Sequence, residues 1–363
     1  MTPPTFPPES VVKRTRLLSR PTTALSIVLV SALALTVAFT PLPQQRQGAP
    51  RLYVENTESG DITVISIPDH KVLRTIPASL LKGHPDDVIL SKDGRTLFVN
   101  LLDRRVIQAI DTGNEKLLWE LPVPGEPHHL ALARGDSILL VPLFSESAIV
   151  AINVHQKRIV GRVETAPGPH AIRVTRDGKR AYVGSLLGDR INIVDLVTMR
   201  VTRGIEFSEG IRPFELSPDE KEAYVQLSKL HGFQVVNLKS GQITHTVNHN
   251  KVAIPDPLPW PHTVNHGMAL TRDGKTLVLA GSLEDAVYLY DATTMRQVAR
   301  IPVDKLPGWI TLSPDERFAY ASNRGPGANT VSVIDIAARK EVARIKVGKI
   351  PQRMTTGYIP AGR

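Results

Sequence analysis

Seven positions in this chain recur at a nearly constant interval, and most of them carry side chains that can do chemistry. They are Asp86, His128, His170, Arg212, His266, Gly308 and Gln352, separated by 42, 42, 42, 54, 42 and 44 residues. Histidine can ligate a metal ion or exchange a proton near neutral pH. Arginine can hold a carboxylate or a phosphate through two parallel hydrogen bonds. If the fold brings these positions together, they form a ring that can bind a ligand or catalyse a reaction.

The stretch 168–207 shows which elements surround such a position. Gly-Pro-His at 168–170 leads into a short apolar strand at 171–174, and a tight turn of Arg, Asp, Gly and Lys follows. Further strands are predicted at 181–184, 191–195 and 199–205. Four short strands cannot bury both of their faces alone, so neighbouring copies of this unit must stack on them.

A second set of positions repeats in the same register. The residue that closes the third predicted strand is Asp111, Asn153, Asp195, Asn237, Asp291 and Asp335 in turn, and the first four lie 42 residues apart. A period of about 40–45 residues with four strands is typical of propeller blades rather than of helical solenoids. The sequence therefore predicts an all-β protein, a seven-bladed β-propeller with four-stranded antiparallel blades.

The two ends of the repeat region predict how the propeller closes. Three strands at 52–54, 61–67 and 72–76 precede the first complete blade, and one inner strand at 352–358 follows the last. Together they make up the seventh blade, a three-plus-one seam that hides strand edges which an open array would expose. The first strand of each blade lines the central channel of a propeller. We therefore expect the recurring positions to form a ring at one mouth of this channel.

Several aspartates in the repeats have a structural explanation. Lys92–Arg95, Arg176–Lys179 and Arg272–Lys275 carry the Asp-Gly pattern of tight hairpin turns. Ser217–Glu220 and Ser313–Glu316 occupy the same place with the sequence Ser-Pro-Asp-Glu. We expect these aspartates to form turns and not to take part in catalysis.

Two interpretations of the ring stay open. In the first, the ring binds a ligand, and its site residues are Asp86, His128, His170, Arg212, His266 and Gln352. In the second, polar side chains at a wet channel mouth only bond water and strand ends. A metal site made of the three histidines is not predicted, because their blades are not all adjacent and no local metal-binding spacing supports them. The sequence identifies neither a catalytic residue nor a cofactor.

The longest interval between recurring positions indicates an insertion. The step of 54 residues exceeds the usual 42 by 12, and the added stretch includes Ile254 to His262 with four prolines. Connections between blades in this register emerge on the same face as the ring. Trp260 and His262 could therefore cover a ligand there. The alternative is a rigid insertion with Trp260 packed on the rim of the propeller.

The composition excludes some functions. The chain has 363 residues and no cysteine, which excludes disulfides, a thiol nucleophile and thiolate metal sites. Its net charge is +9, of which residues 1–43 carry +3, and the remaining +6 is spread over the rest of the chain without a basic run, so nucleic acid is not an expected partner. We expect a monomer whose partner is a small molecule or another protein at the channel mouth.

The N-terminal part of the chain predicts export. Lys13, Arg14, Arg16 and Arg20 precede an apolar run of 16 residues from Ala24 to Phe39, which is the layout of a secretory signal peptide. The run has no clear cleavage site, so residues 1–43 are either a signal peptide or an N-terminal membrane anchor. A linker is expected at 44–50, the propeller at 51–358 and a short tail at 359–363. The propeller should lie outside the cytoplasm, in the periplasm or at the cell surface.

The repeats also contain short signature segments. These are Tyr53-Val54-Glu55-Asn56, Phe98-Val99-Asn100, Tyr182-Val183-Gly184-Ser185 and Val331-Ser332-Val333-Ile334-Asp335. In these segments the chain resembles the YVTN-type (YncE-like) β-propeller repeats of bacterial surface and periplasmic proteins. The resemblance extends from residue 51 to about 358. This resemblance implies the fold but no single activity, since similar repeats occur in binding scaffolds, lactonase-like enzymes and cytochrome d1-like domains.

Three functions are compatible with these observations. The first is an exported binding module that presents the His/Arg-lined channel mouth to a ligand or partner. The second is a lactonase-like hydrolase with a ring histidine as base and Arg212 on the substrate carboxylate; Pro127-His128 and Pro169-His170 are similar to that group. The third is a cytochrome d1-like domain, although the chain has no Cys-x-x-Cys-His motif for haem attachment. We favour the binding module.

Overall fold

A computed structural model describes residues 48–249, 252–255 and 263–361. The chain divides into two units, Met1–Gln44 and Gln45–Arg363, and the propeller belongs to the second. The predicted signal peptide or anchor lies outside the described residues, as do Trp260 and His262. Among the described residues, no helix combines the length and the apolar character needed to cross a lipid bilayer.

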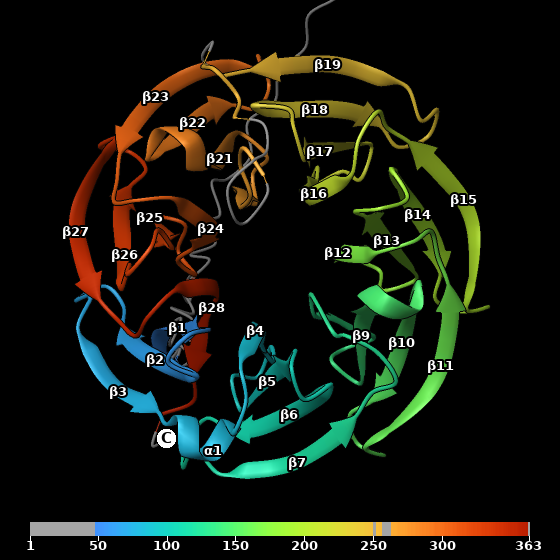
Figure 1. Ribbon diagram of the computed structural model, residues 1–363, viewed down its shortest axis with the longest axis vertical. Coiled ribbons are helices and arrows are strands. Elements are labelled where there is room, and N and C mark those ends of the chain that lie inside the picture. The colour runs from blue at the N-terminus through green and yellow to red at the C-terminus, as the bar shows by residue number, and fades with distance from the viewer. Residues whose placement is uncertain (1–47, 250–251, 256–262, 362–363) are drawn as a thin grey trace, which may run out of the picture. The chain divides into compact units, whose positions relative to one another are not determined.

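The described part of the chain forms seven four-stranded antiparallel sheets arranged in a ring (Figure 1). Blade 1 contains β28 (Pro351–Ile359), β1 (Ala49–Asn56), β2 (Asp61–Ser66) and β3 (Val72–Ile76); blade 2 contains β4 (Pro85–Leu90), β5 (Thr96–Leu101), β6 (Val106–Asp111) and β7 (Leu117–Pro122). Blade 3 contains β8 (Ala131–Ala133), β9 (Ile138–Leu143), β10 (Ala148–Asn153) and β11 (Arg158–Glu164); blade 4 contains β12 (Pro169–Val174), β13 (Arg180–Ser185), β14 (Arg190–Asp195) and β15 (Arg200–Glu206). Blade 5 contains β16 (Ile211–Leu216), β17 (Glu222–Leu227), β18 (Gly232–Asn237) and β19 (Ile243–Asn248); blade 6 contains β20 (Met268–Leu270), β21 (Thr276–Gly281), β22 (Ala286–Asp291) and β23 (Arg296–Pro302). Blade 7 contains β24 (Pro307–Leu312), β25 (Phe318–Asn323), β26 (Thr330–Asp335) and β27 (Lys340–Lys346). The predicted fold class is confirmed.

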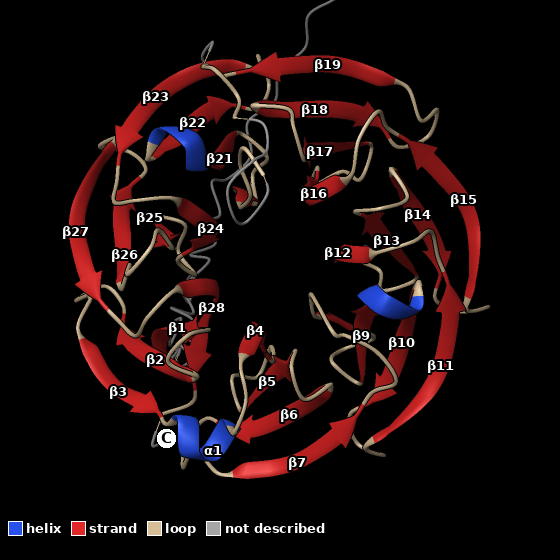
Figure 2. Ribbon diagram, viewed as in Figure 1, coloured by secondary structure: helices blue, strands red, loops and turns tan. Residues whose placement is uncertain are grey.

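Helix is scarce in the described residues (Figure 2). One short α-helix, α1 (Ala78–Leu81), leads from blade 1 to blade 2, and two 3-10 turns, Phe144–Glu146 and Ser282–Glu284, follow the second strands of blades 3 and 6. The first strand of each blade lies nearest the axis and the fourth lies at the circumference (Figure 1). The inner strands therefore carry the residues that can meet at the centre.

The predicted three-plus-one seam is confirmed. The last strand, β28, pairs antiparallel with β1, the first strand of the described chain, so that Ala49 lies opposite Ile359 and Val54 opposite Met354. Blade 1 is thus completed by residues from both ends of the propeller. Without this pairing, β1 would be an edge strand of blade 1 and β28 would belong to no sheet.

The aspartates of the predicted hairpin turns act in those turns, as expected. In the first turn of blade 4, Asp177 Oδ1 accepts hydrogen bonds from Thr175 Oγ1 at 2.6 Å and from the Lys179 amide at 3.0 Å. The corresponding Asp93, Asp219, Asp273 and Asp315 make equivalent bonds. The residues that close the third strands do the same for the next turn: Asp195 Oδ1 accepts from the amides of Val197 and Thr198. Local hydrogen bonding in turns therefore explains why Asp and Asn recur at these positions, without any catalytic role.

The hydrophobic core is divided among the spaces between neighbouring blades. Most residues of the second and third strands are buried, and apolar residues from adjacent sheets pack together, as Tyr182 of β13 and Phe214 of β16 do. The fourth strands have alternating exposed residues because one of their faces meets solvent. The core therefore holds the blades in a fixed register around the axis.

Candidate functional site

A β-bulge near the start of several inner strands determines which side chains meet at the axis. In blade 2, Pro85 pairs with Leu101 but Asp87 pairs with Asn100, so Asp86 is an extra residue in its strand. Similar register shifts occur around His170 in blade 4, Arg212 in blade 5 and Gly308 in blade 7. Bulges of this kind redirect side chains next to functional sites. In blades with such a bulge, two consecutive residues can thus contribute to the centre, where the repeat predicted one.

The side chains at these positions form what we call the central polar layer. It consists of Asp86, Asp87, His128, His129, His170, Arg212, His266, Arg324, Gln352 and Arg353. Asp86, His170, Arg212 and His266 have exposed fractions of at most 7%. The expectation that they point into a water-filled mouth is therefore wrong, because these side chains are packed against one another. His128, with a side chain that is 16% exposed, and Gln352 are half-buried.

Four histidines of the layer lie against one another. The His170 ring is central to them, with ring centroids 5.1 Å from His128, 4.6 Å from His129 and 5.9 Å from His266. His266 Nδ1 lies 3.0 Å from the carbonyl oxygen of Gly308, which fixes this nitrogen as the one that carries the proton. Its Nε2 is then the basic atom of the ring.

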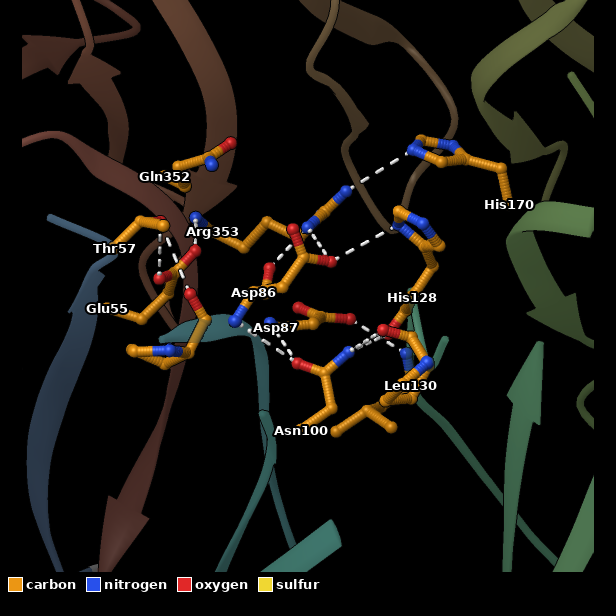
Figure 3. A network of polar contacts seen from close by, with 12 residues as sticks. Glu55, Thr57, Asp86, Asp87, Asn100, His128, Leu130, His170, Gln352 and Arg353 are labelled. Carbon is orange, nitrogen blue, oxygen red and sulfur yellow. Dashed lines mark hydrogen bonds and ion pairs between the residues drawn. The ribbon is translucent and has the colours of Figure 1, made fainter. Parts of the chain in front are cut away.

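Arg353 from β28 connects the acidic and the histidine parts of the layer (Figure 3). Its Nη1 lies 2.6 Å from Asp86 Oδ2 and also contacts the Asp86 carbonyl, while Nη2 lies 3.4 Å from His170 Nε2. The guanidinium stands 5.5 Å from the centre of the Trp309 ring. The Arg353 amide donates to Glu55 Oε1 at 2.9 Å. One residue of the closing strand therefore contacts three other blades.

Asn100 and Asp87 hold the acidic side of the layer in place (Figure 3). The Asn100 side chain accepts hydrogen bonds from the amides of Asp86 and Asp87, and it donates to the carbonyls of Pro127 and His128. Asp87 Oδ2 accepts from the Leu130 amide at 2.7 Å. These bonds link blades 2 and 3 directly beneath His128, whose Nδ1 lies 3.3 Å from Asp86 Oδ2.

Burial and charge shift the ionisation of these groups in opposite directions. Burial would raise the pKa of Asp86, but the Arg353 charge and the contact with His128 lower it far below its usual value. Burial raises the pKa of Asp87 to about 6 and that of Glu55 well above its usual range. Burial, followed by neighbouring positive charges, holds the pKa values of His129, His170 and His266 well below 6.5. At neutral pH the layer therefore contains the carboxylates of Asp86 and, for the most part, Asp87, neutral imidazoles at His129, His170 and His266, and the charged Arg353 guanidinium.

The remaining arginines add positive charge to the layer. Burial and the nearby Arg353 charge lower the pKa of Arg212 to about 10. The same two causes, with the charge of Arg212, lower the pKa of Arg324 to about 9. Both groups stay protonated at neutral pH. Arg212 Nε donates to Ser228 Oγ at 3.1 Å, and Arg324 Nη1 donates to the Gln352 side chain at 3.1 Å.

Arg324 occupies the space that a side chain at Gly308 would take. A Cβ atom added to Gly308 would collide with Cδ, Nε and Cζ of Arg324. Blade 7 thus contributes an arginine from the end of its second strand in place of a side chain at the recurring position. Gly308 has no functional side chain of its own, but its lack of a side chain leaves the space that the Arg324 guanidinium occupies.

Gly308→Ala is expected to lower the free energy of unfolding by about 1–2 kcal/mol, because Arg324 must leave a buried site and lose its bond to Gln352. Gly308→Ala in an Arg324→Ala background should cost much less, since the added methyl group then enters vacated space. Urea denaturation of the four proteins in this cycle measures the coupling. Equal costs in both backgrounds would show that Arg324 does not depend on the glycine.

The predicted site residues that the structure describes all lie in this layer, but the sequence interpretation missed several others. His129, Asp87 and Arg353 directly follow recurring positions, and the bulge that turns such residues inward has no signature in the repeat. Trp309 follows Gly308 in the same way. The described residues contain no group of three or more His, Cys, Asp or Glu side chains that could hold a metal ion.

Comparisons with known proteins bear on the fold alone. No protein-family model matches the chain, and no curated protein matches it. The solved structure of hydrazine synthase from Kuenenia stuttgartiensis is similar over 70% of this chain and 96% of that chain, at 20% identity and a TM-score of 0.49. A functionally unknown protein from Desulfotomaculum acetoxidans is similar over 85% of this chain and 99% of that chain, at 11% identity and a TM-score of 0.70. The latter similarity supports the propeller fold, and the YVTN-type assignment stays a prediction.

Proposed function

We propose that this protein is an exported YVTN-type β-propeller that binds a small carboxylate or a related anion at its central polar layer. The observation that carries the proposal is the convergence of Arg212, Arg324 and Arg353, from blades 5, 7 and 1, with four histidines on the propeller axis. Guanidinium groups bind carboxylates through paired, charge-assisted hydrogen bonds. Neutral imidazoles beside them can donate or accept a further hydrogen bond.

The architecture suits binding more than chemistry on a large substrate. The layer is buried and its side chains are held by contacts between blades, so a ligand meets groups that are already oriented. Such preorganisation lowers the entropic cost of binding. A partner protein at the same mouth would have to reach these groups with a side chain or a terminal carboxylate.

Replacing Arg212 tests the proposal. The parent protein is screened by thermal shift against acetate, benzoate, citrate and inorganic phosphate, and a stabilising anion is then titrated calorimetrically. Arg212→Gln is expected to lower the affinity for this anion about 10-fold to 100-fold, because a hydrogen bond between charged groups contributes about 1.5–3 kcal/mol.

Arg158→Gln serves as the matched control, since Arg158 lies exposed on the outermost strand of blade 3. It should leave the affinity unchanged. Absence of any anion-induced stabilisation of the parent, or equal affinities in Arg212→Gln and the parent, would refute an anion site at this position.

The hydrolase remains a second candidate because of one contact. His128 Nδ1 lies 3.3 Å from the Asp86 carboxylate, so Asp86 can orient the ring and leave Nε2 as a base. At this distance the contact is electrostatic, and such contacts often tighten only when a substrate is bound. The screen therefore includes γ-butyrolactone. Hydrolysis that is lost in His128→Gln would select the hydrolase over the binding module.

The extracytoplasmic location rests on the N-terminal segment. Four basic residues before an apolar run motivate it, and no described residue bears on it. Fractionation of cells that make the full chain, followed by N-terminal sequencing, separates a cleaved protein from an anchored one. Recovery of the propeller in the cytoplasmic fraction would contradict export.

A further inference from the structure

A cavity lies on the axis next to the central polar layer. It has a volume of about 450 Å³, and inner strands of all seven blades contribute to its wall, so it is part of the central channel. Its size falls within the roughly 300–1,000 Å³ of small-molecule sites. Most of the wall is aliphatic, with Ile89, Leu132, Ile172 and Met354 among its members.

The residue three positions beyond each recurring position lies in this wall in six of the blades. In blades 4 and 5 these residues are Arg173 and Glu215, which form a bidentate ion pair with distances of 3.0 and 2.7 Å. Because they are the charged residues of the wall and neutralise each other, the cavity offers no net charge to a ligand. In blades 3 and 6 the same position is Ala131 or Ala269, which leaves space on the axis.

Trp309 joins this cavity to the polar layer. It lines the cavity, and its ring lies 5.1 Å from the His129 ring and 5.5 Å from the Arg353 guanidinium. Their chain neighbours Leu130 and Met354 also line the cavity. Among the described residues, His129 Nε2 and Arg353 Nε have no hydrogen-bond partner, although these residues are only 1% and 3% exposed. Two buried polar atoms without partners thus lie beside Trp309 at the boundary of an apolar space.

We infer that the ligand is an amphipathic monocarboxylate, with its carboxylate at the polar layer beside His129 and Arg353 and its unbranched apolar chain or ring in the cavity beyond Trp309. This inference rests on the proposed function and specifies the ligand class of the same site. An apolar chain matches the aliphatic, electrically neutral wall, and burying it removes apolar surface from water. A charged tail would instead lose its hydration without gaining a partner.

A chain-length series tests the inference in the full protein. Acetate, butyrate, hexanoate and octanoate are titrated calorimetrically, and hexanol is the uncharged counterpart of hexanoate. Each added methylene is expected to raise the affinity roughly threefold to fourfold, as burial of one methylene group does. Hexanol should bind at least 10-fold more weakly than hexanoate. Ala269→Phe, which fills the cavity, should remove the dependence on chain length and leave acetate binding unchanged; Ala131→Phe is the second variant if the first does not fold.

Each outcome decides between the parent proposal and this one. If acetate binds and the affinity does not rise with chain length, the cavity does not hold the apolar part of the ligand, but the anion site is supported. Hexanol that binds as tightly as hexanoate overturns the link between the cavity and the polar layer. If the affinity of Ala269→Phe or Ala131→Phe still rises with chain length as in the parent, the apolar chain does not lie in this cavity. Absence of binding by every carboxylate overturns the anion site itself, and the ligand class with it.

Discussion

A chain that ends before Pro351 is expected not to fold cooperatively. Deletion of 351–363 removes β28, and with it the strand that completes blade 1 through pairing with β1. It also removes the buried Met354 and Ile359, whose burial contributes about 2 kcal/mol each. Loss of Arg353 leaves Asp86 as a buried carboxylate without its ion pair, which costs about 3–5 kcal/mol. The sum rivals the whole stability of a typical domain.

Circular dichroism melts and size-exclusion chromatography measure this effect. Removal of 361–363 alone is the control and should leave the melting temperature unchanged, because the strand remains intact. A circular permutant offers a second control. Ala49 and Ile359 are paired neighbours, so a short linker from residue 361 to residue 48, with new ends between Lys82 and Gly83, should preserve the fold. A soluble, cooperatively melting deletion of 351–363 would contradict the role of the seam.

The blade register could be predicted from the sequence because its signals are local. The Asp of the hairpin turns and the Asp or Asn that closes the third strand in blades 2 to 7 make hydrogen bonds within two or three residues, so they recur from blade to blade. The seam could be predicted by counting strands, because the three strands at the N-terminal end make an incomplete blade that requires a fourth strand from the C-terminal end. These features need no knowledge of contacts between distant residues.

The composition of the central polar layer could be predicted only in part. The recurring position of each blade is visible in the sequence, but the bulge that also turns Asp87, His129 and Arg353 inward is a three-dimensional feature. Arg324 reaches the layer only because Gly308 has no side chain. Burial of the layer was missed for the same reason, because Asp87, His129, Arg324 and Arg353 add side chains that the recurring positions alone do not reveal.

The buried histidines predict that the protein loses stability as the pH falls from 7 to 5. Burial holds the pKa values of His129, His170 and His266 well below 6.5, and it lowers the pKa of His249 to about 3 with help from the His231 charge. These rings stay neutral in the folded protein, whereas an unfolded chain protonates them below about pH 6.5. Each ring therefore costs stability as the pH falls through this range, by at most about 2 kcal/mol.

Two buried carboxyl groups act in the opposite direction. Burial raises the pKa of Asp87 to about 6 and the pKa of Glu55 well above its usual range, so the folded protein binds protons that the unfolded chain releases above about pH 4. Protonation of these groups stabilises the folded state as the pH falls. Because four rings oppose two carboxyl groups, the net expectation is a loss of stability between pH 7 and pH 5.

Urea denaturation at pH 7, 6 and 5 measures this balance, and Glu55→Gln separates its two parts. The glutamine has the shape of Glu55 and is uncharged like its protonated form, and its side-chain oxygen can accept from the Arg353 amide as Glu55 Oε1 does at 2.9 Å, so the variant should fold. It cannot titrate, which removes the contribution that opposes the histidines. The loss of stability between pH 7 and pH 5 should then be larger than in the parent, by up to about 3 kcal/mol. A flat profile in the parent, or the same slope in both proteins, would mean that the histidines take up protons in the folded state and that the layer is wetter than its burial indicates.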